Sequence, residues 1–167
     1  MAESKKNFDS YFDLEGKIAL ITGAGRGIGR ATALTLARAG ADAALVARSE
    51  DELLSAARAI QELGRRAVTF PADLSQTGRL PSLAAEIAAT MGGIDILVNN
   101  AGVTRDELLI SMEREDWDKV IATNLGGLFN CTKAAAKYMM VQKRGRIINM
   151  SSVTGERGGR GKPNYVA

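Results

Sequence analysis

The sequence predicts an α/β fold in which a doubly wound parallel sheet is covered by helices on both faces. Short apolar runs alternate with longer segments in which apolar residues recur every three or four positions, the spacing of amphipathic helices. Several of the short runs are apolar at consecutive positions, as expected for strands buried on both faces. Because strand and helix alternate along the chain, we expect neighbouring strands to pair in parallel.

Five strands and four helices account for this alternation. The predicted strands are residues 17–22, 42–47, 67–70, 94–98 and 146–150, and the predicted helices are residues 27–39, 50–63, 76–91 and 116–142. We expect Ser49 and Ser75 to cap the helices that follow them, and Gly64 and Gly92 to lie just past helix ends. The sheet is predicted to be truncated after the fifth strand. Residues 155–163, rich in glycine and basic side chains, are predicted to form a mobile loop.

Length, composition and charge restrict the class of protein. The 167 residues are 46% hydrophobic and 25% charged, which is typical of one globular domain and argues against disorder. We expect a polar extension at residues 1–13 and a single domain at 14–167 that is incomplete at its C-terminus. The net charge of +3 comes from scattered side chains, so no nucleic-acid partner is expected. No run approaches eighteen apolar residues, so we expect no membrane partner and a cytoplasmic location.

The cysteine and histidine content narrows the chemistry. Cys131 is the single cysteine and cannot form an internal disulfide, which favours a reducing compartment. No cluster of cysteines indicates a metal site, and no metal is expected. The sequence contains no histidine, so catalysis by imidazole is excluded for these residues.

A glycine-rich turn directly after the first predicted strand is the strongest functional signal. Each glycine costs about 1 kcal/mol relative to alanine inside a helix, so several at a helix start need a reason. Free backbone N–H groups and the helix dipole favour a dinucleotide pyrophosphate there, whereas the alternative is an ordinary tight turn. The position after the first strand favours the nucleotide. The candidate cofactor-binding residues of this turn are Thr22, Gly23, Gly25, Arg26, Gly27, Ile28 and Gly29.

The spacing Thr-Gly-x-x-x-Gly-x-Gly resembles the glycine motif of the short-chain dehydrogenase/reductase family. Further motifs of that family follow in the same order: Asp73 after the third strand, Asn-Asn-Ala-Gly at 99–102 after the fourth, and Asn124 in the last long helix. The resemblance covers about residue 14 to the end. It implies a Rossmann-like fold, an oxidoreductase activity and a nicotinamide dinucleotide cofactor. It also implies that Asp73, Leu74, Asn100, Ala101 and Gly102 bind this cofactor.

The resemblance predicts NADP(H) rather than NAD(H). In the family, an acidic residue at the end of the second strand binds the adenosine ribose and would repel a 2′-phosphate. Here that position is Ala47, followed by Arg48, and Arg26 lies in the glycine turn. Two guanidinium groups can bind a phosphate through charge-assisted hydrogen bonds. The alternative is that both arginines are solvated surface charges.

The family reduces ketones with a set of Asn, Ser, Tyr and Lys. The resemblance implies that Asn124, Ser152 and Tyr165 are catalytic, since Tyr165 follows Ser152 by the family's thirteen residues. Ser152 would bind the substrate oxygen, Tyr165 would deliver the proton and Asn124 would hold a water. The family's lysine lies four residues after the tyrosine, beyond Ala167. We therefore expect a fragment of a longer gene product, inactive by itself.

Two segments resemble one group of enzymes in the family, the 3-oxoacyl-[acyl-carrier-protein] reductases. They are residues 103–109, which include Arg105, and residues 143–149. This resemblance implies NADPH-dependent reduction of a 3-oxoacyl group on acyl-carrier protein to the 3-hydroxyacyl form in fatty acid biosynthesis. It also implies a homotetramer. The alternatives are a related oxidoreductase for another alcohol or ketone, a nucleotide-binding fragment without catalysis, and a non-functional truncation.

Overall fold

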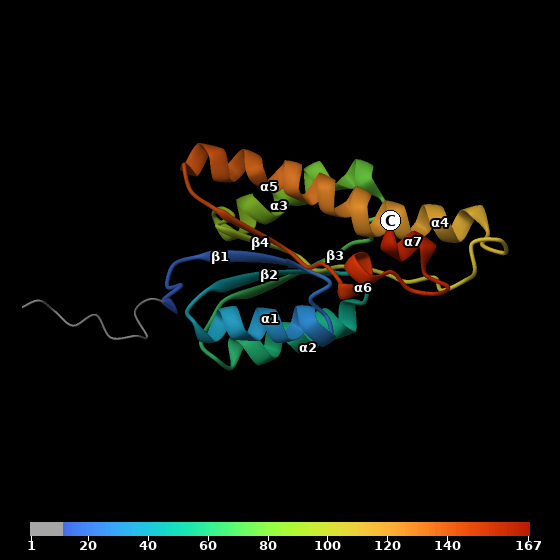
Figure 1. The fold of residues 1–167 in the computed structure, drawn as a ribbon. Coiled ribbons are helices and arrows are strands. Elements are labelled where there is room, and N and C mark those ends of the chain that lie inside the picture. The colour runs from blue at the N-terminus through green and yellow to red at the C-terminus, as the bar shows by residue number, and fades with distance from the viewer. Residues whose placement is uncertain (1–11) are drawn as a thin grey trace, which may run out of the picture.

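A parallel five-stranded sheet lies between two layers of helices in the computed structural model, which describes residues 12–167 (Figure 1). The strands are β1 (Ile18–Thr22), β2 (Asp42–Ala47), β3 (Ala67–Pro71), β4 (Ile96–Asn99) and β5 (Arg146–Asn149). Their spatial order is β3-β2-β1-β4-β5, and every neighbouring pair is parallel. The predicted doubly wound Rossmann-like fold is confirmed. Of the expected extension at 1–13, residues 1–11 lie outside the described residues.

The helices cover the two faces of the sheet in pairs. They are α1 (Gly27–Arg38), α2 (Glu50–Gln61), α3 (Leu80–Met91), α4 (Arg114–Ile121), α5 (Leu128–Gln142), α6 (Val153–Arg157) and α7 (Pro163–Val166). Helices α1 and α2 lie below the sheet in Figure 1, and α3 and α5 lie above it. The short helices α6 and α7 lie near the carboxyl ends of the strands, beside α4.

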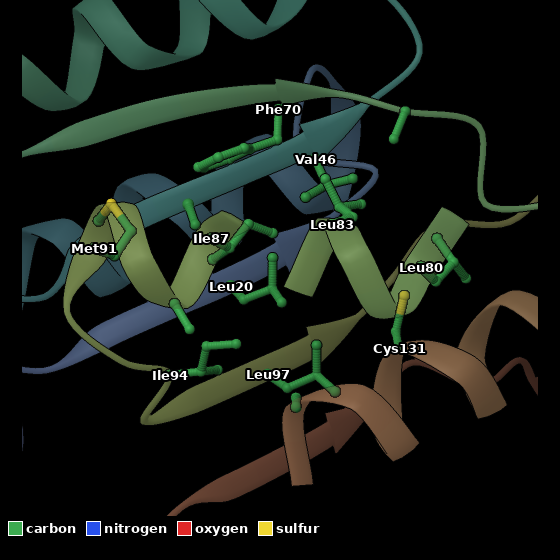
Figure 2. Close-up of a cluster of buried hydrophobic side chains, with 14 of the residues drawn as sticks. Leu20, Val46, Phe70, Leu80, Leu83, Ile87, Met91, Ile94, Leu97 and Cys131 are labelled. Carbon is green, nitrogen blue, oxygen red and sulfur yellow. The ribbon is translucent and has the colours of Figure 1, made fainter. Parts of the chain in front are cut away.

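Two separate hydrophobic cores result from alternation along the buried strands. In β1, Leu20 belongs to the core between the sheet and helices α3 and α5, whereas Ile21 belongs to the core between the sheet and helices α1 and α2. β2 repeats the pattern with Val46 and Leu45. Figure 2 shows the first core, in which side chains of β1, β2, β3 and β4 meet α3 and Cys131 of α5. Burial in this core raises the pKa of the Cys131 thiol to about 11, so the thiol stays protonated at neutral pH.

The helix caps were predicted only in part. Ser49 caps α2 by accepting a hydrogen bond from the Glu52 backbone N–H at 3.4 Å, and Gly92 ends α3 in a left-handed conformation. The prediction that Ser75 caps the next helix was wrong. A 3₁₀ turn (Thr77–Arg79) follows Ser75 and α3 begins only at Leu80, so Ser75 is not next to a helix start, and its hydroxyl donates to the Asp73 carboxylate at 2.8 Å.

The last predicted helix and the predicted loop both differ from expectation. A π-helical turn (Ala122–Gly127) divides the helix predicted at 116–142 into α4 and α5. The loop predicted at 155–163 instead contains the end of α6 and the start of α7. Ser152 caps α6 by accepting from the Thr154 N–H at 3.2 Å, and Pro163 provides a backbone suited to the first turn of α7.

Apolar side chains are exposed on β5 and on the outer face of α5. Ile147 and Ile148 of the edge strand are about two-fifths exposed, and Met140 and Val141 of α5 are 77% and 85% exposed. β5 is the edge strand of the sheet and pairs only with β4 among the described strands. Separately, among residues 12–167 no helix combines the length and the hydropathy needed to span a bilayer.

A buried carboxylate fixes the amino ends of three strands. Asp95, directly before β4, is 6% exposed and accepts hydrogen bonds from the Ile18 N–H, Arg144 Nε and Gln142 Nε2 at 3.0, 3.0 and 3.3 Å. The Asp95 backbone N–H also donates a hydrogen bond to the Ile18 carbonyl, and the Asp95 carbonyl accepts one from the Arg146 N–H. One side chain thus connects β1, β4 and the turn between α5 and β5.

Replacing this carboxylate should therefore destabilise the whole sheet. We expect Asp95→Ala to lower the free energy of unfolding by about 2–4 kcal/mol, because it leaves a buried N–H and a guanidinium without their acceptor. Urea denaturation followed by circular dichroism measures this. The control is Asp118→Ala, which removes an exposed pair with Arg114 on α4 and should cost less than about 0.5 kcal/mol. Equal losses in both variants would contradict the assignment.

Candidate functional site

A cavity of about 380 Å³ opens at the carboxyl ends of the strands. It lies where the chain reverses direction across the sheet, because β1 is adjacent to β2 on one side and to β4 on the other. Its volume is within the range of ligand sites. The predicted cofactor residues that line it are Gly23, Gly25, Arg26, Arg48, Asp73, Leu74, Asn100, Ala101 and Gly102. Thr22, Gly27, Ile28 and Gly29, also predicted, do not line it.

Thr22 joins the two walls of this cavity. Its side chain is buried, and its hydroxyl oxygen accepts hydrogen bonds from the Asn100 and Ala101 backbone N–H groups, both at 3.0 Å. The hydroxyl donates to the Val98 carbonyl at 3.2 Å. In return, Asn100 Nδ2 donates to the Thr22 carbonyl at 3.0 Å. Thr22 therefore shapes the site from behind, while Gly23 and Ala101 form its surface.

The glycines of the turn are needed for close approach and for backbone conformation. A Cβ at Gly29 would overlap the Gly23 carbonyl oxygen and lie 2.5 Å from Asn100 Nδ2, so no larger residue fits at this point of α1. Gly23 and Gly27 have φ angles of +65° and +53°, in the left-handed region that favours glycine. No side chain caps the start of α1. The first N–H groups of that helix are thus available to an anion.

Charged side chains of both signs line the cavity. Arg26 comes from the glycine turn, Arg48 follows β2, and Lys119 reaches in from α4, which sequence reasoning did not predict. Hydrogen bonds from the Ser75 backbone N–H and hydroxyl, together with the charges of Arg48 and Lys119, lower the pKa of Asp73 despite its partial burial. Asp73 is therefore ionised at neutral pH and available as an acceptor.

Asn124 lies in the π-helical turn and binds the connection after β4. Its Oδ1 accepts from the Val103 N–H at 2.8 Å, and its Nδ2 donates to the Val103 carbonyl at 3.0 Å. These bonds hold the chain just beyond Gly102 against the helix. One lone pair and one amide proton of Asn124 are not used by them. The widened turn is a local feature often found at functional sites.

Ser152 and Tyr165 lie on the two short helices at the same edge of the sheet. Ser152 is the first residue before α6, and its hydroxyl donates to Thr154 Oγ1 at 3.1 Å. Tyr165 lies on α7, which packs against both α6 and α4. The structure thus brings their helices together beside the strand ends (Figure 1). Neither residue, nor Asn124, lines the cavity described above.

Asn164 anchors the segment that carries Tyr165, and sequence reasoning missed it. It is 2% exposed, and its Nδ2 donates to the carbonyl oxygens of Arg105 and Asp116 at 3.0 and 3.4 Å. The Glu107 N–H also donates to the Gly161 carbonyl at 2.8 Å. Arg105 and Asp116 are both more than forty residues from Asn164 in sequence, so no local pattern indicates these hydrogen bonds. Within the described part of the chain, no group of three His, Cys, Asp or Glu side chains is placed to hold a metal.

Comparison with known proteins adds to this geometry. The sequence model of the short chain dehydrogenase family matches residues 17–167. The 3-oxoacyl-[acyl-carrier-protein] reductase FabG of Escherichia coli (strain K12) is 45% identical over 156 residues, which cover 93% of this chain and 62% of that protein. The chain therefore spans less than two thirds of the length of this curated relative.

Solved structures of dehydrogenases also resemble this chain in fold and in sequence. A short-chain type dehydrogenase/reductase from Mycobacterium marinum superposes with a TM-score of 0.88 at 36% identity, over 93% of this chain and 64% of the other. NAD⁺-bound xylitol dehydrogenase superposes with a TM-score of 0.88 at 32% identity, over 91% and 59%. Strand order, glycine turn and sequence identity agree, and the chain belongs to the short-chain dehydrogenase/reductase family.

Proposed function

We propose that the protein is an NADPH-dependent oxidoreductase that reduces the 3-oxo group of a substrate carried on acyl-carrier protein. The observation that carries this proposal is the cavity at the sheet's switch point, whose walls hold the glycine turn and two arginines. In this proposal residues 14–167 form the NADP(H)-binding domain, and the protein acts in the cytoplasm. The identity to E. coli FabG, a 3-oxoacyl-[acyl-carrier-protein] reductase, supports the choice of substrate.

The residues of the cavity suit a dinucleotide. Gly23, Gly27 and the uncapped start of α1 would hold the pyrophosphate through backbone N–H groups. Asp73 and Leu74 would contact the adenine at the other end, and Gly102 would let the chain approach the second ribose. The missing Cβ of Gly29 keeps the turn tight enough for this approach.

Arg26 and Arg48 support NADP(H) over NAD(H). Both line the cavity, and Ala47, the last residue of β2, has no carboxylate that could accept hydrogen bonds from the ribose hydroxyls. A 2′-phosphate near this corner would receive charge-assisted hydrogen bonds from guanidinium groups. The similar solved structure of xylitol dehydrogenase is NAD⁺-bound, so NAD(H) is the alternative cofactor that the binding test below must exclude.

The chemistry requires a hydride and a proton. The cofactor supplies the hydride to the carbonyl carbon. Tyr165 would donate its phenolic proton to the carbonyl oxygen, while the Ser152 hydroxyl would hydrogen-bond that oxygen and orient it. Asn164 would keep α7 in place during this transfer, and Asn124 would hold a water with its unused amide positions.

The surface supports two kinds of partner. Arg105 is 44% exposed in its side chain, although it pairs with Asp116 at 3.4 Å, and its guanidinium would be a basic group for an acidic carrier protein to contact. The exposed apolar residues of α5, including Met140 and Val141, suit a contact with a second copy of the chain. We accordingly propose a homo-oligomer, a tetramer as the sequence resemblance implies.

Closing the glycine turn should abolish nucleotide binding. We expect Gly29→Ala to weaken NADPH binding at least about tenfold, because the added methyl group meets backbone that cannot give way. Fluorescence titration of the 167-residue chain with NADPH measures this. The control is Gly78→Ala, whose Cβ would meet nothing within 4 Å. Unchanged affinity in Gly29→Ala would contradict the placement of the cofactor.

A carboxylate at the end of β2 should change the cofactor preference. We expect Ala47→Asp to lower the ratio of NADPH affinity to NADH affinity about tenfold, because it repels the 2′-phosphate and accepts from the ribose hydroxyls. Competitive titration with the two cofactors measures the ratio. Ala47→Asn has the same shape without the charge and should change the ratio less than about threefold. An unaltered ratio in Ala47→Asp would refute the assignment.

Loss of the phenol should abolish reduction without loss of cofactor. The test uses the protein purified from its natural source and the matching recombinant form, because the family's lysine position lies beyond residue 167 of this sequence. We expect Tyr165→Phe to lower kcat at least about 100-fold with NADPH affinity within about twofold. Tyr138→Phe on α5 is the control and should retain activity.

Two further measurements on the natural protein separate the proposed activity from its alternatives. The intact mass of the purified protein shows how far its chain extends, and 3-oxoacyl and other ketone substrates are compared at equal NADPH. Reduction of other ketones alone would replace the proposed substrate. NADPH binding without any turnover by the natural protein would favour a nucleotide-binding module.

A further inference from the structure

Glu52 lies against the glycine turn inside the nucleotide cavity. It is the third residue of α2, and its backbone N–H is the group that Ser49 caps. A Cβ built on Gly25 would lie 2.8 Å from Glu52 Cβ and 2.9 Å from its carboxylate oxygen Oε2. The carboxylate therefore reaches the surface of the turn itself, and Glu52 lines the cavity together with Arg26 and Arg48.

The charge of this carboxylate is not neutralised by a neighbour. Among residues 12–167, no ion pair within 4.0 Å joins Glu52 to a cation, although two arginines line the same cavity. Glu50 and Asp51, which precede it on α2, are exposed and do not line the cavity. All three acidic residues in the first turn of α2 are exposed, but only Glu52 lines the cavity.

We propose that Glu52 is a specificity-determining residue that acts against the 2′-phosphate of NADP(H). This inference rests on the proposed function, which places the adenosine ribose near Arg26 and Arg48. NADP(H) carries a phosphate of about two negative charges at the position where NAD(H) has a hydroxyl. An unpaired carboxylate repels the phosphate and can accept a hydrogen bond from the hydroxyl. The two arginines raise the ratio of NADP(H) affinity to NAD(H) affinity, and Glu52 lowers it. The site thus retains affinity for both cofactors.

Two small ligands test this without any catalytic step. Adenosine 2′,5′-bisphosphate and adenosine 5′-monophosphate differ only in the 2′-phosphate, and calorimetry measures their binding to the 167-residue chain. We expect Glu52→Gln to tighten bisphosphate binding about three- to tenfold at low salt, with less than about a twofold change for the monophosphate. Glutamine keeps the size of the side chain and its suitability for the helix start. Glu50→Gln removes the same charge from the same turn and should alter neither affinity beyond about twofold.

Each other outcome overturns a definite part of the argument. Equal effects of Glu52→Gln and Glu50→Gln would show that only the general charge of α2 matters. Equal tightening of both ligands by Glu52→Gln would show that the carboxylate does not discriminate at the ribose. Either result overturns the inference and leaves the proposed cofactor site intact. If the unmodified chain binds neither ligand, the proposed function fails and the inference fails with it.

Discussion

The Thr22 hydroxyl holds together two segments that are nearly eighty residues apart in sequence, and the shape of the cavity follows from it. It accepts two backbone N–H groups of the turn after β4 and donates to the strand itself, so its hydrogen-bonding capacity is fully used. With β1 and β4 fixed in this way, Gly29 brings α1 against the same turn. A doubly wound sheet always opens a crevice at this position, but the width of the crevice here depends on one side chain and one missing Cβ.

Features that depend on neighbours in sequence could be predicted from the sequence. The alternation of apolar runs located all five strands, and β2 begins and ends as expected, because a strand buried on both faces leaves a continuous apolar run. The glycine turn could also be predicted from the sequence, since Gly23 and Gly27 have backbone conformations that other residues avoid. The helix ends were predicted less accurately: α3 begins at Leu80, after a 3₁₀ turn, and not next to Ser75.

Features that depend on distant partners could not be predicted. Asn164 is buried because α7 folds back onto the loop at Arg105 and onto α4, and neither contact leaves a periodic pattern in the sequence. The segment at 155–163 was predicted as a loop from its glycines, yet α6, which Ser152 caps, extends into it as far as Arg157. Glu52 and Lys119 reach the cavity from the sides of α2 and α4, so their roles depend on how each helix is rotated against the sheet.

The two halves of the candidate site are held in place by different structural elements. The substitutions that each half tolerates therefore differ. The nucleotide half is made of backbone and small residues fixed by Thr22 and Asn100, so few substitutions there are compatible with the fold. Its charge comes instead from side chains that line the cavity, among them Arg26, Arg48 and Glu52, which can change without moving the turn. The half that carries Ser152 and Tyr165 rests on two short helices held by a few hydrogen bonds. Under the proposed function, cofactor choice can therefore change through these charges alone, whereas the position of Tyr165 depends on contacts such as that of Asn164 with the loop after β4.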